Sequence, residues 1–200
     1  MKLYTTLRSP YGRKVLVMAI EKGLENKIEI ILENLQEKSD FLKNNNPLGQ
    51  VPTLLTDDNN ILFDSPVIAE YIDSINSNPK LIPAETNQRI EVLKISALAD
   101  CMVENAINVF YEGIKADNLK DLKKYEKCKN NLENCFSYLE NNISKFSNQV
   151  NMASIAVASG IGYIDFRLNE LGWKNKYPEL ATWFAEFSKR DSMQKTHPKA

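Results

Sequence analysis

Short apolar runs and amphipathic stretches alternate along the first third of the chain. Residues 2–6 and about residues 28–31 have the pattern of strands, whereas about residues 11–23 have the spacing of a helix. A short polar helix at about residues 36–45 runs into a stop at Pro47. Because strand and helix alternate here, the pattern predicts a parallel pair of strands joined by a right-handed crossover.

Two further apolar runs, Thr53–Thr56 and Ile61–Phe63, are separated by four turn-forming residues and predict an antiparallel hairpin. Pro52 stands at the entrance of the first run, where it cannot donate a ladder hydrogen bond. After the second run, Ser65-Pro66 begins a helix at about residues 65–76, in which serine can serve as the cap and proline takes the first helical position. The predicted order is therefore βαβαββα with a mixed sheet.

Turn formers and two prolines then divide the chain, so we expect a linker at residues 78–85. It separates an α/β domain at residues 1–77 from an all-helical domain at residues 86–200. Three helices of that domain are predicted at about residues 86–112, 121–143 and 178–188. A fourth begins after Asn151 and is apolar on nearly all faces, which places it in a core.

The composition is that of an ordinary globular protein, with 43% hydrophobic and 26% charged residues. The formal net charge of −1 gives no footprint for nucleic acid, and lysines near residue 124 are read as a solvated face. No apolar run approaches a membrane span and the first residues lead straight into a strand, so we expect a cytoplasmic protein without a membrane partner.

Three cysteines without a Cys-x-x-Cys pair fit a reducing compartment and argue against a zinc site. Two of them, Cys128 and Cys135, fall on the apolar stripe of a predicted helix and are read as small buried hydrophobes. The single histidine, His197, lies near the end of the chain. No histidine-based triad or metal cluster is therefore expected, and no metal.

Three short motifs carry a resemblance: Ser9-Pro10-Tyr11, then Gln50-Val51-Pro52-Thr53-Leu54, then Asp64-Ser65. In this order and spacing they resemble the glutathione site of the glutathione S-transferase superfamily. The whole chain is similar in length and motif order to small bacterial glutathione-transferase-like proteins that use serine at the thiol. The resemblance implies a thioredoxin-like N-terminal domain, an all-α C-terminal domain and glutathione as co-substrate.

The resemblance also implies how glutathione is held. Ser65 and its amide take the γ-glutamyl carboxylate at a helix N-terminus, and Asp64 faces the adjacent amine. Val51, before a cis bond to Pro52, pairs with the cysteinyl backbone as a short strand addition, and Gln50 belongs to the same binding motif. Read without the resemblance, Pro52 is an ordinary proline at the start of a strand.

For the thiol, the resemblance implies that Ser9 stabilises the thiolate. A helix N-terminus and a nearby cation lower a thiol pKa from about 8.5, and the candidate cations are Arg8, Arg13 and Lys14. Tyr11 in the first helical turn is a rival for this role, and Ser9 taken alone is an ordinary helix cap. Asp100 resembles an acid that reaches the glutathione of a partner subunit in a homodimer, with an exposed helix acid as the alternative.

Serine at position 9 cannot form a mixed disulfide, unlike the cysteine of related branches. The sequence therefore favours a glutathione transferase that activates the glutathione thiolate for attack on an electrophile or peroxide. The alternative is a non-enzymatic interaction protein on the same scaffold, as in the stringent starvation protein A family that binds RNA polymerase. A pocket for the electrophile is expected from four residues of the helical domain: Met102, Asn105, Val109 and Tyr111.

Overall fold

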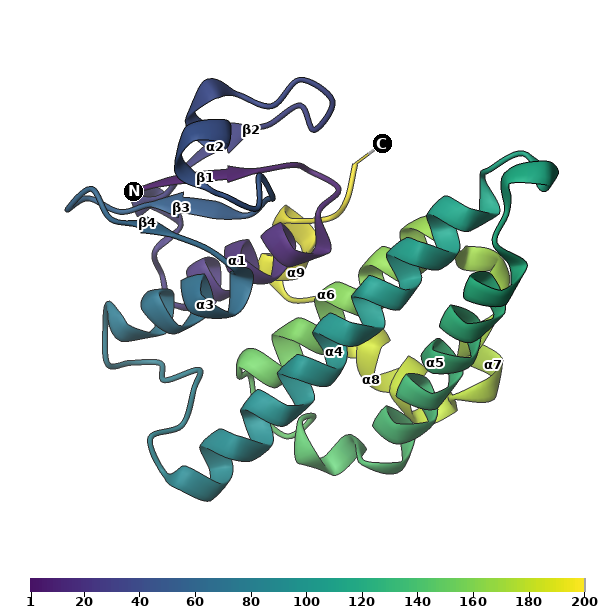
Figure 1. Ribbon diagram of the computed structural model, residues 1–200. Coiled ribbons are helices and arrows are strands. Elements are labelled where there is room, and N and C mark those ends of the chain that lie inside the picture. Colours follow the sequence, from purple (N-terminus) through teal and green to yellow (C-terminus); the bar gives the residue numbers. More distant parts are fainter. Residues whose placement is uncertain (200) are drawn as a thin grey trace. The chain divides into compact units, whose positions relative to one another are not determined.

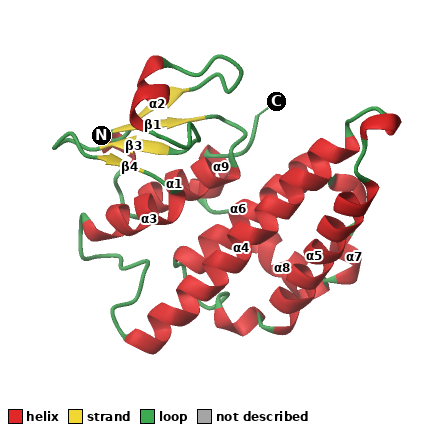
Figure 2. Ribbon diagram, in the orientation of Figure 1, coloured by secondary structure: helices red, strands yellow, loops and turns green. Residues whose placement is uncertain are grey.

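The computed structural model describes residues 1–199 and divides into two units (Figures 1 and 2). The first comprises Met1–Pro83 together with the residues from Arg190 onward, and the second is Ala84–Lys189. The division differs from the expected one at the C-terminus, because residues 190–199, the C-terminal segment, group with the N-terminal unit. Among residues 1–199, no helix is long and apolar enough to cross a membrane.

A four-stranded mixed sheet forms the centre of the N-terminal unit. Its strands are β1 (Lys2–Thr5), β2 (Glu29–Leu32), β3 (Thr53–Leu55) and β4 (Ile61–Leu62), in the spatial order β2-β1-β3-β4. β1 runs parallel to β2 and antiparallel to β3, and β3 runs antiparallel to β4, which confirms the predicted crossover and hairpin. Leu3 and Leu54 face each other across β1 and β3 and are fully buried, so the core begins at these central strands.

The helices of this unit are α1 (Pro10–Glu21), α2 (Asp40–Asn45), α3 (Ser65–Ser74) and α9 (Asp191–Lys195). The first three follow the sequence prediction, and α1 and α3 pack side by side (Figure 1). Gly23, with a φ of 67°, supplies the left-handed residue that ends α1. Val15 of α1 and Ile68 and Ile72 of α3 are fully buried, so both helices contribute apolar side chains to the core of this unit.

The C-terminal segment is fastened to α1 by polar contacts. The Arg13 guanidinium donates to the Met193 carbonyl at 3.0 Å, and burial lowers the pKa of Arg13 to about 10. The Arg190 guanidinium pairs with both carboxylate oxygens of Glu21 at 2.8 Å each, and the Ser192 hydroxyl donates to the same carboxylate at 2.5 Å. These contacts make the last residues of the chain part of the first domain.

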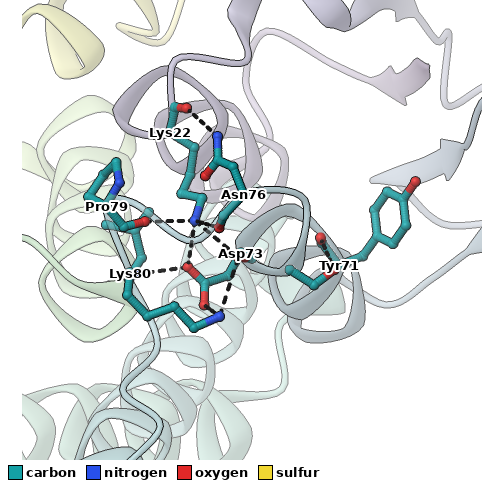
Figure 3. Close-up of polar contacts among 8 residues, drawn as sticks. Lys22, Tyr71, Asp73, Asn76, Pro79 and Lys80 are labelled. Carbon is teal, nitrogen blue, oxygen red and sulfur yellow. Dashed lines mark hydrogen bonds and ion pairs between the residues drawn. The ribbon is translucent and has the colours of Figure 1, made fainter.

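A buried ion pair joins the ends of α1 and α3 (Figure 3). The Lys22 ammonium has no exposed surface and lies 3.1 Å from Asp73 Oδ1, which is itself buried. Three backbone carbonyls, including that of Asn76 at 2.8 Å and that of Pro79 at 2.6 Å, accept from the same ammonium. Lys80 pairs with the other oxygen of Asp73 at 2.9 Å. We call these residues the Lys22–Asp73 cluster.

The second unit is helical, as predicted. It contains α4 (Thr86–Gly113), α5 (Leu122–Asn141), α6 (Met152–Arg167), α7 (Trp173–Lys176) and α8 (Pro178–Phe187). Residues 152–164 of α6 are all buried, in agreement with an apolar sequence on every face. Gly160 lets α6 approach α4 closely, since a Cβ at this position would lie 2.9 Å from Met102 Cε.

A reciprocal cap begins α6. The Ser154 N–H donates to Asn151 Oδ1 at 3.0 Å, and the Asn151 N–H donates to Ser154 Oγ at 2.9 Å. Serine thus replaces the acidic residue of a standard capping box without loss of either hydrogen bond.

Candidate functional site

Three loops meet at one end of the sheet. β1 leads into the loop that carries Ser9, and β3 begins directly after Val51-Pro52. Since β3 runs antiparallel to β1, the end of β1 lies beside the start of β3, and the antiparallel β4 brings Asp64-Ser65 to that same end. The sheet topology therefore gathers the three sequence motifs, although the first and the last of them lie more than fifty residues apart.

Ser9 caps α1. It adopts extended backbone angles and its Oγ accepts a hydrogen bond from the Gly12 N–H at 3.1 Å. Pro10 follows as the first helical residue, as expected. A hydroxyl that accepts through its oxygen still has its own proton to donate, so capping α1 and donating to a ligand are compatible roles for Ser9.

At the start of α3 the structure corrects the prediction. The N-cap is Asp64, not Ser65, and Ser65 is the first residue of the helix. The Asp64 carboxylate accepts from the Ser65 backbone N–H, so that amide is already occupied. The sequence misleads here because aspartate and serine are equally good caps and stand next to each other.

The Ser65 side chain is a buried polar group at this end of the sheet. It is 1% exposed, and its hydroxyl has no hydrogen-bond partner among residues 1–199. Leaving a buried hydroxyl unpaired costs about 1–3 kcal/mol. The hydroxyl therefore has capacity for an external acceptor, and the positive end of the α3 dipole favours an anionic one.

The Val51–Pro52 bond is cis, as the resemblance implies, and Pro52 is buried. Asn46 holds this turn from below: its Nδ2 donates to the Gln50 carbonyl at 3.0 Å and to Thr53 Oγ1 at 2.8 Å. Sequence reasoning missed Asn46, although an asparagine immediately before a proline is a signal for such a turn. Within the described chain Val51 makes no hydrogen bond through its backbone, while the Gln50 side chain is exposed.

The three candidate cations for the thiol differ in their exposure and contacts. Arg13 is occupied by the C-terminal segment and Lys14 is buried at 1% exposure, so Arg8 is the exposed member of the three. Tyr11 is half-buried in the first turn of α1. Tyr4 packs, with its ring stacked 4.1 Å from that of Phe41.

The remaining expected residues belong to the helical unit. Asp100 is half-buried on α4 and is not in the same unit as the other candidates. Of the four residues expected for an electrophile pocket, Met102 and Val109 are buried at 0% and 1% exposure, which makes them core residues, and Tyr111 is 56% exposed. In the part of the chain that the structure describes, no group of three or more histidine, cysteine or carboxylate residues could hold a metal ion.

Comparison with known proteins decides the family. Residues 8–75 match the model of the glutathione S-transferase N-terminal domain. An uncharacterized GST-like protein of Escherichia coli K12, YibF, is 34% identical over 99% of this chain and 98% of its own length. The chain belongs to the glutathione S-transferase superfamily.

Solved structures of the superfamily match both units. A glutathione transferase family member from Pseudomonas fluorescens Pf-5, with bound glutathione, is 32% identical with a TM-score of 0.95 over 100% of this chain and 99% of its own. It also has a structure with bound S-(propanoic acid)-glutathione. A glutathione S-transferase from Methylobacillus flagellatus KT, with glutathione bound, is 33% identical with a TM-score of 0.93 over 99% of both chains. These matches confirm the thioredoxin-like and helical architecture.

Proposed function

We propose that this glutathione S-transferase superfamily member binds glutathione in its N-terminal unit and activates the thiolate for attack on an electrophile or a peroxide. The observation that carries the proposal is the buried Ser65 hydroxyl without a partner at the positive end of α3. A carboxylate is the acceptor that such a hydroxyl and helix end favour. The structures of relatives with bound glutathione support the choice of ligand.

The other anchors follow from the same end of the sheet. Val51 offers a backbone N–H and C=O without protein partners, which suits pairing with the extended backbone of a tripeptide. Asp64, exposed and already bonded to the Ser65 amide, presents a carboxylate for the γ-glutamyl amine. The exposed side chain of Gln50 is a further polar contact beside Val51, while Pro52 fixes the turn.

Ser9 is our candidate for the thiol. As the cap of α1 its oxygen is engaged with the Gly12 N–H, so the hydroxyl proton is directed to another acceptor, and a thiolate at this helix N-terminus would supply one. Tyr11, one residue into the first turn, is the competing donor. Because serine does not form a disulfide, the reaction proposed is attack by the thiolate of glutathione itself rather than disulfide exchange at position 9.

The test is a pH–rate profile of the wild type and Ser9→Ala with 1-chloro-2,4-dinitrobenzene or cumene hydroperoxide as the second substrate. We expect the rate to fall by about one to two decades, because a hydrogen bond to a charged group contributes roughly 1.5–3 kcal/mol. Glutathione affinity should stay nearly constant, and the apparent pKa of the bound thiol should rise.

Ser39→Ala is the matched control, since Ser39 caps α2 by accepting from the Leu42 N–H at 3.2 Å. Both variants lose a cap, but only the change at position 9 should alter the profile. Coincident profiles of wild type and Ser9→Ala would assign the thiolate to Tyr11 or to backbone amides. Retention on immobilised glutathione without turnover of any electrophile or peroxide would overturn the transferase proposal and favour a binding protein on this scaffold.

The proposal extends to assembly and location. We propose a homodimer in which Asp100 serves the glutathione of the partner subunit, with the mass from light scattering as its test. A monomer that still binds glutathione would refute it. Cytoplasmic location is proposed because the three cysteines are free thiols.

A further inference from the structure

Two of the three free cysteines lie on two helices that pack against each other. Cys101 lies on α4 and Cys135 on α5, and both thiols belong to the helical unit. Cys101 is exposed, whereas Cys135 is 7% exposed. Sequence spacing does not predict that the two cysteines are neighbours in space, because the end of α4, a loop and the start of α5 lie between them.

Polar contacts fix the register of α4 against α5. Glu112 lies 3.9 Å from Lys124, and Asn131 Nδ2 donates to Asn105 Oδ1 at 3.0 Å. Asn105 stands seven residues before Glu112, and Asn131 stands seven residues after Lys124. Equal steps in opposite directions mean that the two helices run antiparallel in a constant register over this length.

The same register continues past the cysteines. Lys145, just beyond the end of α5, lies 3.7 Å from Glu91, so the pairing holds one further stretch toward the start of α4. Cys101 is one turn before Asn105 and Cys135 is one turn after Asn131. Residues four apart share a helix face, so Cys101 is placed opposite Cys135. The two positions lie between the Asn105–Asn131 contact on one side and the Glu91–Lys145 contact on the other.

Two observations support this placement. The Asn105 side-chain amide donates to the Cys101 carbonyl at 2.7 Å while its oxygen accepts from Asn131, so the turn that carries Cys101 is tied to α5. Burial, and then the neighbouring Cys101, raises the pKa of the Cys135 thiol to about 11. The second cause agrees with the register, which places Cys101 on the stretch of α4 opposite Cys135.

We propose that Cys101 and Cys135 form a redox pair that a low-molecular-weight disulfide, glutathione disulfide, oxidises to an intrachain disulfide between α4 and α5. The site lies in the helical unit, does not use Ser9 or Ser65, and does not rest on the proposed function. A disulfide requires Cα atoms about 4.4–6.8 Å apart, which adjacent positions on closely packed helices can reach.

The exchange proceeds in two balanced steps. The Cys101 thiolate, on the accessible side, attacks one sulfur of glutathione disulfide, forms a mixed disulfide and releases the first glutathione. The Cys135 thiolate then attacks the Cys101 sulfur and releases the second. Two cysteine thiols lose two electrons and two protons, and one glutathione disulfide becomes two molecules of glutathione.

The order of the steps follows from burial. Cys135 is sheltered from an external disulfide, and its raised pKa leaves little thiolate at neutral pH, so it is the resolving rather than the attacking group. Its advantage is proximity, since an intramolecular attack has a high effective molarity. Cys128, also 7% exposed on α5, is about two turns away and has no cysteine opposite it, because the register pairs it with Asn108.

The experiment equilibrates the full-length protein in buffers of increasing glutathione disulfide to glutathione ratio, traps thiols by alkylation, and counts them by intact mass. The reduced protein should carry three alkylatable thiols and the oxidised protein one. Peptide mapping of the wild type should recover Cys101 linked to Cys135, which keeps the test valid even if a variant folds poorly.

The matched variants are Cys135→Ala and Cys128→Ala, because both remove a buried thiol from α5. Cys135→Ala should stop at a stable glutathionyl adduct on Cys101, whereas Cys128→Ala should close the disulfide as the wild type does. Ser65→Ala should also close it normally, so failure of glutathione binding does not affect the result. Three thiols at every ratio, a Cys101–Cys128 link, or a disulfide between chains would overturn the proposal.

Discussion

Replacing Ser65 by alanine should change the stability of the free protein and its affinity for glutathione in opposite directions. In the free protein the hydroxyl is 1% exposed and has no partner among the described residues, so alanine removes a buried polar group that nothing satisfies. An unsatisfied hydroxyl costs about 1–3 kcal/mol, and its removal should raise the free energy of unfolding by about 1 kcal/mol. For a chain of this size the Tm should rise by roughly 2–4 °C.

With ligand the sign reverses. If the γ-glutamyl carboxylate accepts from the Ser65 hydroxyl, alanine loses a hydrogen bond to a charged group worth roughly 1.5–3 kcal/mol. The dissociation constant for glutathione should then increase about 10- to 150-fold. The α3 cap is unaffected, because Asp64 supplies it.

Thermal unfolding with and without glutathione, together with calorimetric titration, measures both effects. Ser159→Ala is the control: Ser159 is also 1% exposed with an unpartnered hydroxyl among residues 1–199, but it lies on α6. It should raise the Tm of the free protein without changing glutathione affinity. A Ser65→Ala variant with a lower Tm and unchanged affinity would show that the hydroxyl has a structural partner and no ligand.

Lys22→Met should lower the free energy of unfolding by about 3–5 kcal/mol, because it leaves the buried Asp73 carboxylate without its buried cation. Lys80→Met should lower it by about 1 kcal/mol or less, because the Lys80 side chain is 45% exposed. Equal losses for the two variants in denaturant titrations would contradict this. Burial alone would raise the pKa of Asp73, but hydrogen bonds from Lys80, a backbone N–H and Lys22 hold it below its usual value. The stabilisation by Asp73 is therefore present above the unfolded pKa of about 3.9 and is lost as the pH falls through the lower folded pKa. In Asp73→Asn the urea midpoint should consequently decline less steeply with falling pH than in the wild type. An unchanged dependence of the urea midpoint on pH would refute the assignment. Gly160→Val should destabilise by about 1–3 kcal/mol through overpacking against Met102; an unchanged Tm would show that α4 and α6 separate freely.

Most of the fold could be predicted from the periodic spacing of apolar residues along the sequence. The strand and helix order of the first domain and the helices from α4 to α6 could be predicted because each has a continuous apolar face and a clear stop, such as Gly23. The short helix α9 was missed, since five residues carry too little periodic signal and its contacts are with α1, far away in sequence. Local patterns do not encode such a distant partner.

The candidate site divides in the same way. Motif order located Ser9, Val51-Pro52 and Asp64-Ser65, but not their hydrogen bonds. Only the structure distinguishes Asp64 as cap from Ser65 as the residue with the unpartnered hydroxyl, because both types cap helices equally well. It likewise removes Arg13 from the thiol, because its partner is a backbone carbonyl near the end of the chain.

The C-terminal segment also has a consequence for how the protein is made. Its contacts to Arg13 and Glu21 complete the first domain with residues that the ribosome adds only after the whole helical unit. At roughly 5–20 residues per second, synthesis of the intervening helical unit takes on the order of ten seconds. During that interval α1 lacks its contacts with the C-terminal segment, and Arg13 lacks the Met193 carbonyl as its acceptor. A nascent chain stalled after Lys189 should therefore expose α1 to proteases, even though every residue of the sheet has already been translated.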